Sequence, residues 1–247
     1  MNRSTRASLL ITALAIAAIA AMTGSAFARS PVSDLARTGK ARSTSSNWSG
    51  YAAKNSTFSD AKGSWVVPAA NCTQMKGQQV SIASPWVGLD GYTSGTVEQT
   101  GTDTDCIGKS PYYQAWYEFY PQQLVTFGGA VHAGDAMNAE VSHSGSTTTV
   151  TLQDVTQGWT NSASSTLSFA LSSAEWIMEA PSSKLTDFGS VSFTNAGATN
   201  GTTTNGAISA FDHDAITLVS KNGRTARAAP SALSGGGRSF SVAFQSP

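Results

Sequence analysis

The stretch Ser84–Asp103, SPWVGLDGYTSGTVEQTGTD, carries the pattern from which the fold can be predicted. Two apolar segments, Trp86–Leu89 and Thr96–Val97, stand on either side of the polar connection GYTSG. Apolar segments separated by a short glycine-containing connection predict a strand, a tight turn and a second strand. Because side chains alternate between the two faces of a strand, Glu98 and Gln99 must point to opposite faces. One of them faces inward, where a buried polar group needs a partner or a function.

The N-terminal residues have the pattern of an export signal. Arg3 and Arg6 precede the apolar run Leu9–Ala21, and the tripeptide Ala26–Ala28 follows as an A-x-A cleavage pattern. The apolar run is shorter than the roughly 20 residues that a membrane-spanning helix needs. We therefore expect residues 1–28 to be a signal peptide, the protein to be secreted, and no membrane association after the signal is removed.

Residues 29–46 are polar, with four basic residues, one acid and no apolar periodicity. This composition predicts a disordered linker or a short pro-segment. Of the 15 basic and 15 acidic residues of the chain, six basic and one acidic precede Asn47, which leaves nine basic and fourteen acidic residues. Residues 47–247 are therefore acidic overall, without the basic patch that nucleic-acid binding needs. Their length fits one domain.

From Asn47 onward, short apolar segments alternate with glycine, serine, threonine, asparagine and aspartate. Many short strands at regular spacing predict an all-β antiparallel sandwich or barrel. Only Leu167–Met178, rich in alanine and serine, would also suit a helix. The expected strands are Trp48–Ala53, Gly63–Val67, Trp86–Leu89, Thr96–Thr100, Tyr113–Tyr120, Ala136–His143, Thr147–Asp154, Thr166–Ala170, Glu175–Glu179, Ser190–Thr194, Ala215–Ser220 and Ser239–Phe244.

The chain has two cysteines, Cys72 and Cys106, and in an exported protein we expect a disulfide between them. Neither has a histidine close by in sequence, which argues against a metal site. His132, His143 and His213 also lack any zinc-binding spacing. We therefore expect no metal and no cofactor.

The common catalytic motifs are missing, and the candidates that remain are carboxyl and amide groups. The sequence contains no G-x-S-x-G motif and no paired Asp-Thr-Gly or Asp-Ser-Gly motifs. Instead, Asp90, Glu118, Glu175 and Glu179 lie in segments rich in tryptophan and tyrosine, with few basic residues nearby. Carboxyl groups that are buried without a cation have raised pKa values and often mark functional sites. On a strand, Glu175 and Glu179 would share a face about 13 Å apart.

Seven blocks in order resemble the glutamic peptidases, or eqolisins, over essentially the whole of Asn47–Phe244. The resemblance implies a sandwich of two antiparallel sheets, similar to the concanavalin-like lectin sandwich, and proteolysis at acid pH by a glutamine and a glutamate. Carried over by motif, these residues are Gln99 and Glu179. The blocks are NWSGY (47–51), WVVP (65–68), WVGLDG (86–91), QTG (99–101), WYEFYP (116–121), AGD (133–135) and AEWIME (174–179).

Peptide hydrolysis needs an activated water and a donor for the developing oxyanion. As a carboxylate, Glu179 would take a proton from water, and once protonated it would give that proton to the leaving nitrogen. Its unperturbed pKa of about 4.3 suits this exchange in acid. The Gln99 amide stays neutral, so its N–H groups would remain donors for the oxyanion. Histidine would be protonated at such pH and useless as a base.

The resemblance also implies supporting residues around the catalytic pair. Trp48, Trp86, Asp90 and Glu118 fall in blocks that line the site in that family. We expect Asp90 to orient Glu179 or Gln99 by hydrogen bonds, and Trp48 to form a wall of the site. Glu98 departs from the fungal pattern, and alternation suggests that it faces outward while Gln99 faces the site.

The sequence thus predicts a secreted, metal-independent acid endopeptidase that acts on protein or peptide substrates as a monomer. Two alternatives remain open. One is a lectin-like carbohydrate-binding β-sandwich that uses the exposed aromatic residues. The other is a glycosidase with two of Glu118, Glu175 and Glu179 as its carboxylate pair, which requires a separation of roughly 5–10 Å.

Overall fold

The computed structural model describes residues 29–247 except residues 40, 78 and 183, so the predicted signal peptide lies outside the described residues. The described residues form seventeen strands and two single-turn 3₁₀ helices, η1 (Ile208–Ala210) and η2 (Gly235–Gly237). The strands are β1 (Ala36–Gly39), β2 (Arg42–Ser45), β3 (Trp48–Lys54), β4 (Phe58–Val66), β5 (Val80–Ser81), β6 (Ser84–Leu89), β7 (Val97–Ile107), β8 (Ser110–Tyr120), β9 (Val125–Thr126), β10 (Ala136–Ser144), β11 (Thr147–Asp154), β12 (Trp159–Ser165), β13 (Ala174–Glu179), β14 (Ser190–Asn200), β15 (Asp212–Val219), β16 (Ala226–Pro230) and β17 (Phe240–Phe244).

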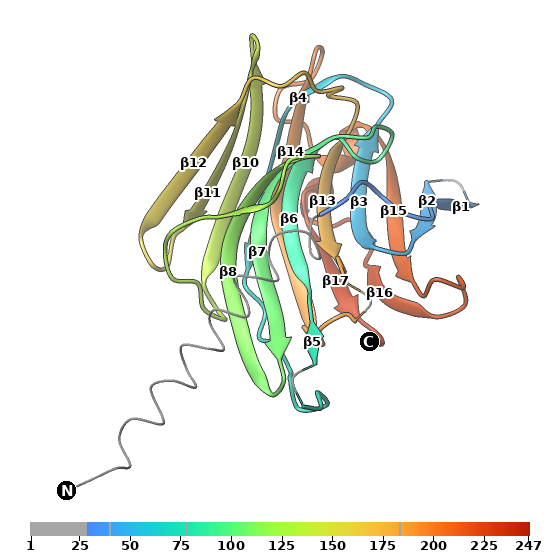
Figure 1. Ribbon diagram of the computed structural model, residues 1–247. Helices are drawn as coiled ribbons and strands as arrows, with labels where there is room; N and C mark the ends of the chain where they lie inside the picture. The colour runs from blue at the N-terminus through green and yellow to red at the C-terminus, as the bar shows by residue number, and fades with distance from the viewer. Residues whose placement is uncertain (1–28, 40, 78, 183) are drawn as a thin grey trace, which may run out of the picture.

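The strands form one continuous hydrogen-bonded sheet that folds back on itself into two layers (Figure 1). Strand pairing runs β12-β11-β10-β4-β14-β17 through the first layer and β3-β13-β6-β7-β8 through the second. Strands β16 and β15 join the two layers. All of these pairs are antiparallel. The predicted all-β, antiparallel two-sheet sandwich is therefore confirmed.

The main core lies between the two layers. It is built from the alternate apolar side chains that each strand turns inward, such as Trp65 and Phe193 from the first layer and Trp176 and Leu89 from the second. A second, smaller apolar cluster lies on the opposite face of the second layer and contains Trp48, Trp86, Trp116 and Ile177. We call this face of the second layer the site face, because the predicted catalytic residues lie on it.

The hairpin predicted in Ser84–Asp103 forms as β6 and β7. Trp86 lies opposite Gly101, and Leu89 lies opposite Glu98. The prediction of a strand over Thr166–Ala170 is wrong, because the strand β12 ends at Ser165 and an irregular segment follows. The ambiguous run Leu167–Met178 contains no helix, and only its end enters a strand, β13.

Residues 29–46 differ from the expected disordered linker. They include β1 and β2, and β2 pairs in parallel with β15. Arg29, at the start of the segment, is 1% exposed. β1 pairs with β2 inside the segment, whereas β2 also pairs with β15, which is distant in sequence, and local composition could not reveal that second pairing.

The expected disulfide between Cys72 and Cys106 is confirmed, and it ties the loop after β4 to the end of β7. Among the described residues, no helix is long and apolar enough to cross a bilayer. No cluster of three or more metal-binding side chains occurs among them either.

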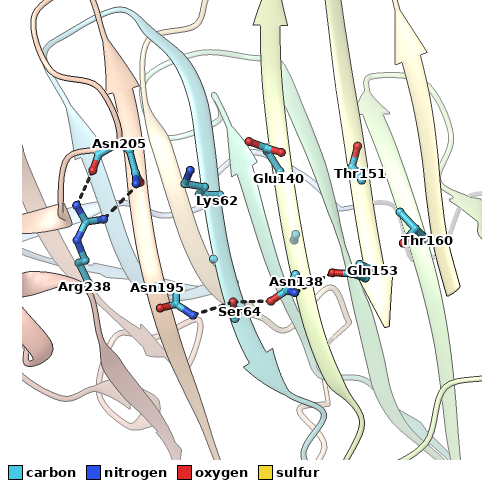
Figure 2. A pocket seen from close by; sticks show the side chains of 12 residues that line it. Lys62, Ser64, Asn138, Glu140, Thr151, Gln153, Thr160, Asn195, Asn205 and Arg238 are labelled. Carbon is cyan, nitrogen blue, oxygen red and sulfur yellow. Dashed lines mark hydrogen bonds between the residues drawn. The ribbon is translucent and has the colours of Figure 1, made fainter. Parts of the chain in front are cut away.

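A polar groove of about 650 Å³ runs over the outer face of the first layer (Figure 2). Serine, threonine, asparagine and glutamine side chains line it, together with Lys62, Glu140 and Arg238. Ser64 donates to Asn138 across two neighbouring strands. None of the predicted site residues lines this groove, so it is separate from the candidate active site.

Candidate active site

The register of four neighbouring strands brings the predicted pair to one face. Glu179 on β13 lies opposite Ser84 on β6, and Gln99 on β7 lies opposite Glu118 on β8. Gln99 also lies opposite Gly88 on β6. Alternation along each strand therefore turns Glu179, Gln99 and Glu118 toward the site face, where all three are completely buried.

Three donors hold the Glu179 carboxyl. The indole Nε1 of Trp86 donates to its Oε2 at 2.9 Å, and the Asn47 amide donates to its Oε1 at 3.4 Å. The backbone N–H of Ser30 also donates to this carboxyl. Burial raises the pKa of Glu179 to about 7, and the Arg29 charge and these hydrogen bonds offset part of that increase.

Gln99 is oriented by Glu118. Its Nε2 donates to Glu118 Oε2 at 2.9 Å, and the same oxygen accepts the backbone N–H of Arg29 at 3.1 Å. Burial raises the pKa of Glu118 to about 8, with the nearby Glu179 adding to the increase and Arg29 opposing it. The amide of Gln99 and a peptide N–H therefore converge on a single carboxyl oxygen.

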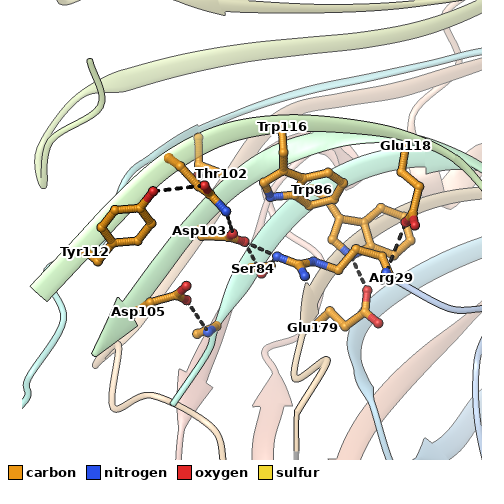
Figure 3. A network of polar contacts seen from close by, with 12 residues as sticks. Arg29, Ser84, Trp86, Thr102, Asp103, Asp105, Tyr112, Trp116, Glu118 and Glu179 are labelled. Atoms are coloured by element: carbon orange, nitrogen blue, oxygen red, sulfur yellow. Dashed lines mark hydrogen bonds and ion pairs between the residues drawn. The ribbon is translucent and has the colours of Figure 1, made fainter. Parts of the chain in front are cut away.

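Tryptophan side chains form the apolar part of the site, as Figure 3 shows for Trp86 and Trp116. Trp48 packs edge-on against Trp86, with 5.0 Å between the ring centroids. Unlike Trp86, Trp48 has an indole Nε1 that is buried without a hydrogen-bond partner. The role of Trp48 as a wall of the site stays a prediction, and Trp86 binds Glu179 through its indole N–H.

Asp90 does not orient either member of the pair, which corrects the expectation from sequence. Its carboxyl accepts the backbone N–H groups of Leu171 and Ser172, both at 2.7 Å, and the hydroxyl of Ser94 at 3.0 Å. Asp90 lies just beyond the end of β6, beside these loops. It fixes the loop before β13 to the β6–β7 turn.

Glu98 is also not on an outward face. Alternation does place it opposite to Gln99, but that face looks into the core between the two layers, and Glu98 is completely buried. Glu175 lies on β13 four residues before Glu179 and is completely buried as well. Burial raises its pKa well above the usual value.

Arg29 and Asp103 also lie at the site, although neither was among the residues predicted from the sequence. The Arg29 guanidinium binds the Asp103 carboxylate and the Ser84 hydroxyl, as Figure 3 shows. Asp103 lies four residues after Gln99 on β7, so alternation could have placed it on the same face. Asn47, also missed, stands in the NWSGY block. Nothing in the local sequence marks Arg29, which is 74 residues away from Asp103.

The fold is similar to that of two solved glutamic peptidases. Scytalido-glutamic peptidase with a transition-state analogue inhibitor superposes with a TM-score of 0.67 at 25% identity, covering 81% of this chain and 98% of that chain. Aspergilloglutamic peptidase from Aspergillus niger superposes with a TM-score of 0.58 at 29% identity, covering 66% of this chain and 99% of that one.

Two relatives agree in sequence. Aspergillopepsin-2 of Aspergillus niger is 32% identical over 189 residues, which span 66% of this chain and 67% of that protein. Scytalidopepsin B of Scytalidium lignicola is 33% identical over 147 residues, spanning 57% of this chain and 54% of that protein.

The model of the Peptidase A4 family matches residues 46–241, and the chain belongs to this family. The predicted resemblance and the expected glutamic-type peptidase are therefore confirmed, and the family favours protein or peptide substrates over carbohydrate.

Proposed function

We propose that the protein is a secreted acid endopeptidase in which Glu179 activates water and Gln99 stabilises the oxyanion. The observation that carries the proposal is a stretch of peptide backbone that binds both Glu179 and Glu118, the partner of Gln99. The N–H of Arg29 binds the same Glu118 oxygen as the Gln99 amide, and the next N–H along the chain, that of Ser30, binds Glu179. A substrate backbone on the same path would lie between the two groups.

In the proposed reaction, ionised Glu179 takes a proton from a water molecule as its oxygen attacks the peptide carbonyl carbon. The carbonyl oxygen becomes an oxyanion and accepts a hydrogen bond from Gln99 Nε2. Glu118 holds one N–H of that amide and leaves the other for the oxyanion. Protonated Glu179 then gives its proton to the leaving nitrogen as the C–N bond breaks, which releases an acid and an amine.

The base form of Glu179 has to be available in acid. Its pKa of about 7 applies while residues 29–32 cover the site, and desolvation is the largest cause of the increase. When residues 29–32 leave and water enters, this desolvation penalty falls, and the lowering effects of the Arg29 charge and the Ser30 N–H are lost with the segment. The Trp86 indole donates to the ionised form and lowers the pKa further.

Secretion is part of the same proposal. The signal pattern in residues 1–28 supports it, and the disulfide between Cys72 and Cys106 is consistent with an oxidising compartment. An enzyme released into acidic surroundings would meet protein substrates there.

Substitution of the two catalytic residues tests the mechanism. We expect Glu179→Gln and Gln99→Ala to lower kcat on denatured protein near pH 3 to 4 by about 10²-fold or more, because each removes one proposed catalytic group. Glu175→Gln is the matched control, since it changes a buried glutamate on the same strand and should retain activity. Full proteolysis by Glu179→Gln, or loss of activity in the Glu175→Gln control alone, would contradict the assignment.

A further inference from the structure

Residues 29–32 lie over the site face in the manner of a bound peptide. Several of their contacts run through backbone atoms. Besides the N–H groups of Arg29 and Ser30, the Asn47 amide donates to the carbonyl oxygens of Ser30 at 3.4 Å and Pro31 at 3.2 Å, and the N–H of Val32 donates to Gly91 O at 3.0 Å. Backbone contacts of this kind do not depend on sequence. Another peptide on the same path could make all of them.

The Arg29 side chain, in contrast, enters a specific pocket (Figure 3). Its Nη2 donates to Ser84 Oγ at 2.7 Å and forms an ion pair with Asp103. Its Cζ lies 4.8 Å from the ring centroid of Trp116, so the guanidinium also makes a cation–π contact. The Asp105 carboxyl is a further acidic neighbour of the guanidinium, and the whole Arg29 side chain is withdrawn from solvent.

The pocket is organised by contacts that Arg29 does not supply. Ser84 Oγ donates to Asp103 Oδ1 at 2.5 Å, and Gln114 Nε2 donates to Asp103 Oδ2 at 2.6 Å. Tyr112 in turn donates to Gln114 Oε1 at 3.1 Å. This chain of hydrogen bonds aims the buried Asp103 carboxylate, which is 2% exposed, toward the bound cation.

We propose that the pocket of Ser84, Asp103, Asp105 and Trp116 is a substrate subsite that selects an arginine beside the peptide bond to be cleaved. The inference rests on the proposed function, because it is the assignment of Gln99 and Glu179 that makes this backbone path the substrate path. Arg29 occupies the subsite in the structure and must leave before a substrate enters. The N–H of Arg29 binds Glu118, the partner of Gln99, and the N–H of Ser30 binds Glu179, so on this path the selected residue flanks the reacting bond.

The geometry favours arginine over other side chains. A planar guanidinium can lie against an indole and still donate at its edge to a carboxylate and a hydroxyl, whereas an ammonium group is a compact point charge. A neutral side chain would leave the buried Asp103 carboxylate without its cation, which is costly away from water. We therefore expect a preference in the order arginine, lysine, citrulline.

Matched peptide substrates test the selection. Peptides that differ only in arginine, lysine or citrulline at one position are digested by the wild-type protein, and mass spectrometry identifies the bonds cut. We expect kcat/KM to be at least about 10-fold higher for arginine than for citrulline, at a bond that this residue flanks. In Asp103→Asn the ratio should fall close to one, whereas Glu140→Gln, a surface carboxyl of the other layer, should leave it unchanged.

A second variant and a binding measurement test the subsite even if Asp103→Asn does not fold. Ser84→Ala removes a single hydroxyl and should lower the ratio of arginine to citrulline by less. In the protein carrying Arg29→Gln, the pocket has lost its own guanidinium, and calorimetry should detect binding of argininamide but not of citrullinamide. The wild-type protein, with Arg29 in place, should bind argininamide more weakly.

The peptide digestion and the binding measurement together distinguish failure of this inference from failure of the proposed function. Selective binding of argininamide without hydrolysis of any peptide would support the subsite and overturn the assigned reaction. Hydrolysis that treats arginine and citrulline alike, or equal binding of the two amides to Arg29→Gln, would overturn the subsite and leave the reaction standing.

Discussion

At the scale of single residues, Trp86 and Trp48 have different roles beside Glu179. Trp86 donates its indole N–H to the carboxyl at 2.9 Å, while Trp48 packs edge-on against Trp86 with its own N–H unpartnered. A hydrogen bond to a charged group contributes about 1.5–3 kcal/mol. Trp86 therefore stabilises the ionised form of Glu179 and lowers its pKa.

We expect Trp86→Phe to raise the pKa of Glu179 by about one unit or more, because the ionised carboxyl loses a donor while the ring packing is kept. Below that pKa the ionised fraction falls about tenfold per unit, so activity in acid should fall by a similar factor. The pH dependence of kcat measures the shift. Trp48→Phe is the matched control, and an equal shift in both variants would contradict a polar role for Trp86.

At the scale of strands and hairpins, close backbone approach between β6 and β7 sets the position of Gln99. Gly101 lies opposite Trp86, and a Cβ at position 101 would meet the carbonyl oxygen of Pro85 and approach Trp86 Cβ to 2.6 Å. Backbone atoms cannot move aside as a side-chain tip can. The glycine of the QTG block therefore allows the two strands to pair beneath the proposed catalytic glutamine.

We expect Gly101→Ala to lower the free energy of unfolding by about 1–3 kcal/mol, since an added methyl group forces the strands apart. Proteolysis should fall as well, because Gln99 lies two residues away on the same face. Urea unfolding followed by tryptophan fluorescence measures the stability. Gly95→Ala is the control, because a Cβ there meets only open space. An unchanged unfolding midpoint in Gly101→Ala would show that the strands accommodate the methyl group.

At the scale of the whole molecule, buried carboxyl groups make the folded protein more stable at acid pH than at higher pH. Burial raises the pKa of Glu98 to about 10, with the neighbouring Asp90 adding to the increase. Burial also raises the pKa values of Glu175 and Asp105 well above their usual range. A raised pKa in the folded state means that the folded protein binds the proton more tightly than the unfolded chain does. Stability is then full below the unfolded pKa of about 4.5 and is lost as the pH rises.

For Glu98 the loss runs from about pH 4.5 up to about pH 10, at a slope of at most about 1.4 kcal/mol per pH unit. We expect Glu98→Gln to be more stable than the wild-type protein above neutral pH, because the amide carries no charge to bury. The difference should vanish near pH 4. Urea unfolding at a series of pH values measures both curves, and parallel curves from pH 4 to 9 would contradict the assignment.

Local patterns in the sequence determine much of this protein. Alternation and turn residues predict the β6–β7 hairpin and the all-β class, because strand formation depends on short-range spacing. The ordered blocks from NWSGY to AEWIME identify the family and the candidates Gln99 and Glu179. The pair Cys72 and Cys106 predicts its disulfide, since the chain has only these two cysteines.

The tertiary structure decided which groups meet across long separations. Alternation put Glu98 on the opposite face from Gln99, but only the packing of the two layers showed that this face is the core. Asp90 binds a loop some eighty residues on, and Arg29 reaches Asp103 across 74 residues. Such contacts arise from how the folded layers bring strands together, and no local spacing encodes them. For that reason the sequence indicates the chemistry of the site. The segment 29–32 that covers the site, and the pocket that holds Arg29, become visible only in the fold.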